Sequence, residues 1–216
     1  MALTISAFEG LVRDVLNEGT TADAVISSAT RQVVRALENL HTFLYMESRE
    51  TFDLPPAVSA TALAPAVDLL ADLKEVFSAR VYDPVSPLER WSFEQVSVRD
   101  FVIPPVGSPR NYTMLDERTI QPVETWETTT FKAEIHLSRF TVWPTDKNQG
   151  HWLLDNAEGY MLNAVVLEVL PFARNPELAQ LVAPLVQSKL PAVISADETL
   201  RQSNRIIQVN APGQEV

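Results

Sequence analysis

The sequence contains no cysteine, and this absence removes several kinds of chemistry at once. Disulfide bonds, thiolate nucleophiles and thiolate metal sites are all excluded, so packing alone must hold the fold together. Glycine is also scarce, with 6 residues against 15 prolines. Because the glycines are scattered singly, the sequence shows no glycine-rich phosphate loop, no dinucleotide fingerprint and no Gly-x-Ser-x-Gly elbow. The usual signatures of nucleotide-binding proteins and serine hydrolases are therefore missing.

Positive charge is also in short supply. The 17 Lys and Arg residues face 28 Asp and Glu residues, which gives a formal net charge of −11. An acidic chain of this kind repels phosphate backbones, so tight sequence-independent binding to nucleic acid is disfavoured. No uninterrupted apolar run approaches the roughly 18 residues of a membrane span, and the first residues lack the basic region of a signal peptide. We expect a soluble protein that is not exported and makes no contact with membranes.

Hydrophobic residues make up 46% of the 216 residues, which is ample for a core. Near the amino terminus, apolar residues recur at steps of three and four from Ile5 onward, and this period predicts a short first helix with Gly19 as its terminator. A second amphipathic helix is predicted from Ala22 to about Tyr45, with Thr21 as its cap. The chain is therefore expected to begin with two helices.

The middle of the chain, residues 47–149, carries ten prolines and leaves no room for long helices. The clearest strand is residues 131–140, where Phe131, Ala133, Ile135 and Leu137 share one face. One or two helical turns are expected within residues 88–101. Further strands are predicted at residues 47–54, which we expect at a sheet edge, at 73–82, and in a hairpin of 111–115 with 119–123.

Helical periodicity returns after Gly150, with a broad apolar face over residues 152–170. Asn175 and Pro176 suit the start of a second helix, in which Pro184 and Pro191 are expected to produce two or three straight pieces. Ile206, Ile207 and Val209 then predict an extended arm. The predicted fold class is α+β: a discontinuous helical bundle from residues 1–46 and 150–204, a β-rich, Pro-rich insertion at 47–149, and an extended C-terminal arm at 205–216.

Few residues offer catalytic or metal chemistry. His151 and Asp155 stand four apart at a helix start, a spacing that can place two metal ligands on one face, but no third ligand lies near them in sequence. Asp155 is therefore expected to cap the helix, Trp152 to anchor the helix start against the β insertion, and His41 and His136 to be ordinary histidines. We predict no catalytic, cofactor or metal site. The remaining candidates are the carboxylate pairs Asp116 with Glu117 and Glu124 with Glu127, and the tryptophans at 91, 126, 143 and 152.

The run from Trp152 to Val182 resembles a segment of the head-to-tail adaptor proteins of tailed bacteriophages. In that family a strand like residues 131–140 leads through a loop to a Trp-Leu-x-x-Asn-Ala helix start, here Trp152 to Ala157, and then to a break and a long final helix. The helix from Ala22 to Tyr45 and the extended segment after it also look like the family's amino-terminal part. Residues 58–106 match poorly, and Pro184 and Pro191 depart from a final helix that is usually unbroken.

The resemblance implies a structural virion protein without enzymatic activity. Such a subunit would form a homo-oligomeric ring of about twelve copies beneath the portal protein, receive a tail nozzle or other tail component, and let DNA pass without specific binding. It would reside in the neck of the virion, and in the host cytoplasm during assembly. Ile206, Ile207 and Val209 are then the expected portal or subunit contacts. The alternative is a small hydrolase or carbohydrate-binding module of a tail or cell-wall complex, which the carboxylates and tryptophans leave open.

Overall fold

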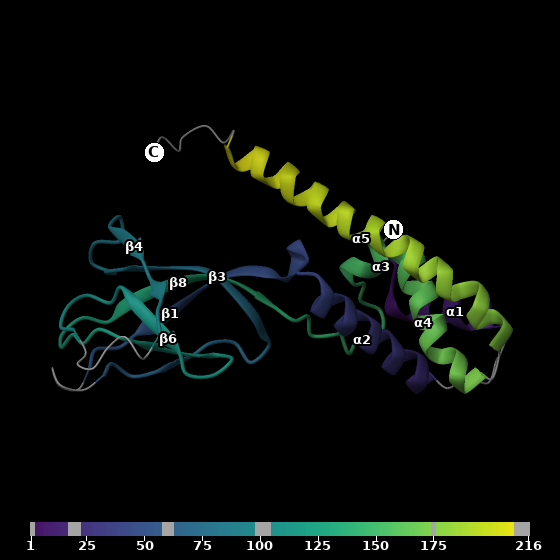
Figure 1. The fold of residues 1–216 in the computed structure, drawn as a ribbon, viewed down its shortest axis with the longest axis horizontal. Coiled ribbons are helices and arrows are strands. Elements are labelled where there is room, and N and C mark those ends of the chain that lie inside the picture. Colours follow the sequence, from purple (N-terminus) through teal and green to yellow (C-terminus); the bar gives the residue numbers. More distant parts are fainter. Residues whose placement is uncertain (1–2, 17–22, 58–62, 98–104, 174–175, 210–216) are drawn as a thin grey trace. The chain divides into compact units, whose positions relative to one another are not determined.

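The computed structural model describes residues 3–16, 23–57, 63–97, 105–173 and 176–209, the side chains of 173 and 204–209 excepted. The chain divides into two compact units (Figure 1). We call Met1–Tyr45 with Val142–Val216 the helical unit, and Met46–Thr141 the β unit. Gly19, Thr21 and Asn175, which the sequence analysis assigned to helix ends, lie outside the described residues.

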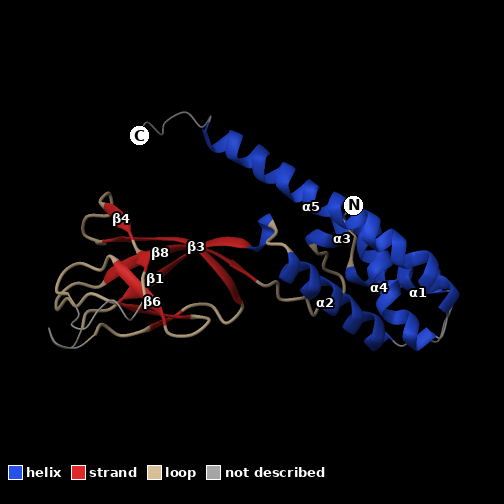
Figure 2. Cartoon of the chain, in the orientation of Figure 1, coloured by secondary structure: helices blue, strands red, loops and turns tan. Residues whose placement is uncertain are grey.

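The helical unit contains all the α-helices of the described chain (Figure 2). Helix α4 is central, because α1, α2, α3 and α5 all pack against it. Its buried side chains include Met161, Val165, Val166, Val169 and Leu170, which form the broad apolar face expected from the sequence. The helices are α1 (Ile5–Leu16), α2 (Asp23–Leu40), α3 (Trp152–Asn156), α4 (Glu158–Ala173) and α5 (Pro176–Val209).

The described residues of the β unit form two four-stranded sheets. The first has the order β1-β8-β3-β4, all antiparallel, and the second has the order β2-β7-β6-β5, in which only β5 and β6 run parallel. A short 3₁₀ helix, Leu44–Met46, precedes β1. The strands are β1 (Glu47–Leu54), β2 (Val67–Asp68), β3 (Leu73–Tyr82), β4 (Arg90–Ser92), β5 (Glu94–Gln95), β6 (Asn111–Met114), β7 (Thr119–Pro122) and β8 (Phe131–Arg139).

Side chains from both sheets share one hydrophobic core. Phe131, Ala133, Ile135 and Leu137 of β8 are buried, which confirms the predicted alternation along this strand. Tyr112 of β6 and Ile120 of β7 join the same cluster from the second sheet. Since β1 pairs with β8 along its whole length, the chain enters and leaves the β unit on neighbouring antiparallel strands.

The predicted fold class requires correction. We expected one helical bundle interrupted by an insertion, whereas the middle of the chain forms two sheets that enclose their own core, with helices at both ends. Along the chain, the boundaries between the two units fall at residues 45/46 and 141/142, whereas 46/47 and 149/150 were predicted. The physical reason is that the short strands β2, β5, β6 and β7 build a second sheet, so the first sheet has a covering layer without any helix. Their weak two- to four-residue patterns carry little periodic signal.

The first helix, the hairpin and the edge position of β1 are confirmed. Two local predictions are wrong. Helix α2 ends at Leu40 instead of near Tyr45, and residues 90–95 form short strands instead of helical turns.

Helix α5 also differs from expectation, because it is one helix from Pro176 to Val209. Pro184 and Pro191 both lie on its exposed side, whereas Val182 and Val193 are buried on the opposite side. The carbonyl groups that lose a partner at each proline therefore face solvent, where water can bond to them. The predicted extended arm at 205–209 is likewise wrong, since these residues continue the helix.

Within α5, residues Pro176–Ser203 are long and apolar enough to cross a membrane, as judged by length and composition alone. A single helix of this kind is a weak indication of a membrane span, because helices of soluble proteins also pass such a test. The window includes Lys189 and several polar residues, so it is not an uninterrupted apolar run.

Candidate functional site

A buried polar network connects α5 to the segment that follows α2. Asp197 of α5 is 0% exposed, and its carboxylate contacts His41 Nε2 at 3.0 Å and accepts a hydrogen bond from the backbone N–H of Leu44 at 2.8 Å. Arg201, one turn further along α5, donates from Nε to Asp197 at 2.9 Å and from its other end to the carbonyl oxygen of Thr42. His41, Thr42 and Leu44 are thereby all bound to one face of α5. His41 was predicted to be an ordinary histidine, because Asp197 lies 156 positions away in the sequence.

An aromatic cluster lies at the start of α3. The Trp152 ring packs against Phe43 and Tyr45, with centroid distances of 5.8 and 5.1 Å. His151 contacts the rings of Tyr45 at 5.5 Å and Trp143 at 4.9 Å. Trp152 therefore anchors its helix within the helical unit, not against the β insertion as predicted.

His151, and not Asp155, is the N-cap of α3. Its backbone is extended, and its Nδ1 accepts a hydrogen bond from the backbone N–H of Leu153 at 3.2 Å. The side chain is only 7% exposed, and its Nε2 has no hydrogen-bond partner among the described residues. Burial lowers the pKa of His151 from 6.5 to about 4, and the nearby Asp155 offsets part of this effect.

A second charged cluster lies beside α1. Glu9 is buried, and it accepts a hydrogen bond at 2.7 Å from Lys147, which is also 3.5 Å from Asp23. The hydrogen bond from Lys147 to Glu9 raises the pKa of Lys147, and the one from Arg13 lowers the pKa of Asp23. These groups neutralise one another, so the cluster joins α1, α2 and the loop before α3.

The helical unit also exposes apolar surface. A groove of about 480 Å³ runs between α2 and α4. Its lining consists of Ala24, Val25, Ser28, Ala29 and Gln32 of α2 and of Glu168, Pro171 and Phe172 of α4. Phe172 is 69% exposed, and on the outer side of α5 Leu181 is 70% and Leu185 45% exposed. A contiguous apolar patch, as distinct from a single exposed apolar residue, marks a surface that contacts another molecule.

The histidines and acidic residues do not assemble a metal site within the described part of the chain, where no group of three or more His, Asp or Glu residues is placed to hold an ion. Asp155 accepts a hydrogen bond from the backbone N–H of Leu3 at 2.7 Å, while His151 Nδ1 is occupied by its capping role. His136 lies on the polar face of β8, 3.1 Å from Glu47 of β1, and contacts the Phe77 ring.

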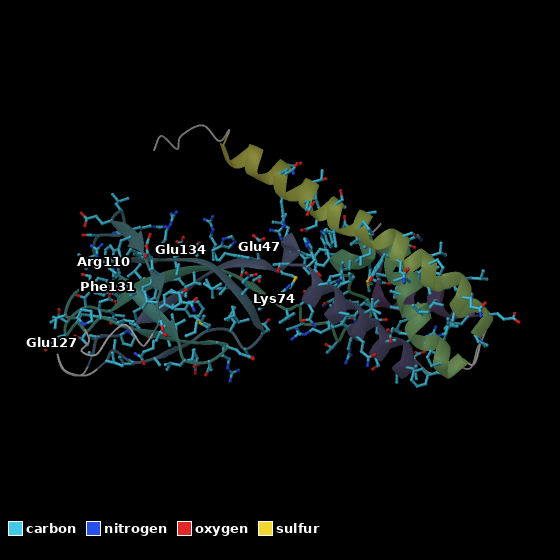
Figure 3. All side chains as sticks on the ribbon, in the orientation of Figure 1. Glu47, Lys74, Arg110, Glu127, Phe131 and Glu134 are labelled. Carbon is cyan, nitrogen blue, oxygen red and sulfur yellow. The ribbon has the colours of Figure 1, made fainter. Side chains whose placement is uncertain are left out.

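One carboxylate of each candidate pair has structural partners within the β unit. Glu124 is buried and accepts hydrogen bonds from the backbone N–H groups of Arg110 and Asn111, both at 3.0 Å, whereas Glu127 is exposed (Figure 3). Asp116 accepts hydrogen bonds from the backbone N–H groups of Arg118 at 2.8 Å and Thr119 at 2.7 Å, and the first of these lowers its pKa most. Both carboxylates therefore stabilise the hairpin region.

Two of the tryptophans are engaged in the same unit. Trp91 donates from Nε1 to the carbonyl oxygen of Pro109 at 2.6 Å, and Trp126 donates to that of Thr129 at 2.7 Å. Both rings pack edge-on against Phe131. Their indole groups thus serve the core of the β unit.

The expected contact residues Ile206, Ile207 and Val209 occupy the last turns of α5, and their side chains lie outside the described residues. The candidate functional surface of the described chain is thus the outer side of α5 with the adjoining end of α4. No known protein family matches the chain, and no characterised protein shows significant sequence similarity to it.

Proposed function

We propose that this chain is a structural subunit of a tailed-bacteriophage neck, a head-to-tail adaptor that forms a ring beneath the portal protein. The observation that carries the proposal is the outer side of α5. From Leu178 to Ala196 the only charged residue is Lys189, and its Nζ is turned to the carbonyl oxygen of Gly159 at 3.1 Å. The exposed leucines 181 and 185 lie in this stretch. A protein of net charge −11 thus keeps one long helical face free of acidic groups.

An uncharged face suits contact between copies of an acidic protein. Two subunits of like charge repel where acidic surfaces meet, and the desolvation of unpaired carboxylates adds to the cost. A helix face with leucine, proline and small polar side chains carries neither penalty, and its burial stabilises the contact by the hydrophobic effect. The face is therefore suited to subunit packing in a ring.

The resemblance to the adaptor family supports the same function. The segments that carry it follow one another along the described chain as α2, β1, β8, α3 with α4, and α5. In the proposed ring of about twelve copies, Ile206, Ile207 and Val209 at the end of α5 contact the portal or a neighbouring subunit. A tail nozzle or another tail component binds the other side. DNA passes through the channel, and the acidic charge of the subunits keeps its phosphates from binding tightly.

The test is assembly on the purified portal protein, observed by electron microscopy and light scattering. We expect rings on the portal with the native chain, and loss of ring formation when Leu181 and Leu185 are both changed to Glu, because this brings acidic charge into the contact. Leu88→Glu is the matched control, since Leu88 is an exposed leucine of the β unit, and it should leave assembly intact.

A monomer in the absence of portal agrees with the proposal, because a subunit of this kind can assemble only on its platform. Failure of the native chain to bind portal or form rings at any ratio would refute it. The hydrolase or carbohydrate-binding alternative gains no support from the arrangement of Glu124, Trp91 and Trp126, whose polar atoms bond within the β unit.

A further inference from the structure

The segment 147–155 holds the first described residues of the chain in place. We call this set of contacts the N-terminal clasp. It consists of four interactions: Leu3 N–H to Asp155 Oδ1 at 2.7 Å, a bridge between Thr4 and Gly150, Ile5 N–H to the Gln149 carbonyl at 3.0 Å, and Ser6 N–H to the Lys147 carbonyl at 2.9 Å. The docking of the start of α1 therefore depends on the conformation of the loop that leads into α3.

His151 lies at the centre of the clasp, between Gly150 and the first turn of α3. Its Nδ1 accepts the hydrogen bond from the Leu153 N–H, and only the unprotonated nitrogen can do so. The ring proton of the neutral side chain must then be on Nε2, which is buried and has no hydrogen-bond partner among the described residues. The hydrogen bond at the centre of the clasp therefore requires His151 to be neutral, with its ring proton on Nε2.

Few groups around His151 could stabilise a positive charge on its imidazole ring. Asp155 on α3 is the acidic group acting on it, and one oxygen of that carboxylate already accepts from Leu3. Tyr45 faces the imidazole from the segment after α2, and its hydroxyl group donates to Glu38. In the preceding loop, Lys147 is paired with Glu9, and Asp146 accepts from the backbone N–H of Asn148.

We propose that His151 is an acid-sensitive lock, and that its protonation opens the N-terminal clasp and releases residues 3–6 together with the start of α3. A proton on Nδ1 would set two donors, the imidazole N–H and the Leu153 N–H, against each other. It would also place a cation among the rings of Tyr45 and Trp143 in a site closed to water. Turning His151 out into solvent relieves both but leaves the Leu153 N–H without its acceptor, and in the proposed lock residues 150–153 then leave their positions.

The direction of the pH effect follows from the burial of the imidazole. The pKa of His151 is about 4 in the closed clasp and returns toward 6.5 when the ring is exposed. Between these values the open form binds a proton that the closed form does not, so acid favours opening. The ratio of open to closed clasp should rise about tenfold for each pH unit below about 6.5, and level off near pH 4. Above pH 6.5 the clasp should be insensitive to pH.

Hydrogen exchange of the full-length chain, followed by NMR between pH 7 and 4 and corrected for the intrinsic exchange rate, tests the lock. Protection of the Leu153, Ile5 and Ser6 amides should fall about a hundredfold across this range. The amide of Val165, in the buried part of α4, should keep its protection, which separates clasp opening from global acid unfolding.

The variant His151→Asn should abolish the pH dependence, because the Asn side chain accepts the capping hydrogen bond and does not titrate. His136→Gln is the matched control, since it removes a histidine of the β unit and should leave the response of the clasp unchanged. Equal loss of protection in His151→Asn and in the native chain would overturn the lock.

A titration of the imidazole signals of the native chain gives a second test that does not depend on a folded variant. A measured His151 pKa at or above 6.5 would also overturn the proposal. The lock is independent of the proposed ring, so neither result bears on the other.

Discussion

Asp197 is a single side chain on which two separate parts of the helical unit depend. Its carboxylate is fully buried. It contacts His41 and accepts a hydrogen bond from the Leu44 N–H, both outside its own helix, and it accepts another from Arg201 of the same helix. A buried carboxylate is costly to desolvate, and it is tolerated here because donors surround it. Such groups contribute to the choice of one conformation more than to stability as such. In this chain the conformation concerned is that of residues 41–45.

Replacement of Asp197 by Ala should lower the free energy of unfolding by about 2–4 kcal/mol, because the half-buried guanidinium of Arg201 and the part-buried N–H of Leu44 lose their acceptor. Asp197→Asn should cost less, about 1–3 kcal/mol, since the amide oxygen can still accept from Leu44. Urea unfolding followed by circular dichroism measures both. Glu198→Ala, at the exposed neighbouring position, is the control and should change stability by no more than about 0.5 kcal/mol. Equal effects at 197 and 198 would contradict a structural role for the network.

At the scale of the secondary-structure elements, helix α5 departs from the rule that a proline breaks or kinks a helix. Two prolines inside a helix predict breaks, yet the helix continues through both, because one side carries buried and half-buried residues from Val182 to Asp197 and α5 packs on α4. Tertiary contacts on one face thus outweigh the loss of two backbone hydrogen bonds on the other. Local propensity is a weak rule where a long apolar face is available for burial.

Pro184→Ala should stabilise the chain by about 2 kcal/mol, because it restores a backbone hydrogen bond and removes the clash of the ring with the preceding turn. The gain is less than the full helix penalty of proline, since alanine also gives the unfolded chain more freedom. Urea unfolding measures the change, and Ala192→Ser, an exposed substitution on the same helix, serves as the control. Destabilisation by Pro184→Ala would mean that α5 must bend at this position to follow α4.

At the scale of the whole molecule, the chain consists of two units with separate interiors. Residues 46–141 enclose their own hydrophobic core, and their two ends lie on paired strands, since Glu47 is opposite Ser138. Excision of this segment cuts the chain at neighbouring points and leaves both sheets complete. The unit therefore has what an independently folding domain requires.

A fragment of residues 46–141 should fold alone, with a β-type circular dichroism spectrum and a cooperative thermal transition. Ile135→Ala in this fragment should lower the free energy of unfolding by about 2–5 kcal/mol, because Ile135 is 1% exposed in the shared core. Lys132→Ala, on the polar face of the same strand, is the control and should cost less than about 1 kcal/mol. A fragment without a cooperative transition would show that the core is insufficient without the helical unit.

The sequence by itself determined the elements whose periodic pattern is long enough to be distinctive. The first helix and β8 lie where the apolar spacing predicts them, since a stretch of nine or more residues repeats its pattern several times. Strand β3 lies where strand-forming residues predict it, and β1 lies where an extended segment stopped by two prolines predicts it. Only the tertiary structure decided the second sheet, the continuity of α5, and the roles of His151 and Asp197. The two-residue strands β2 and β5 hold too few repeats to be recognised, and a helix through prolines depends on the face it buries. His41 and Asp197 lie 156 positions apart, so no local pattern contains both.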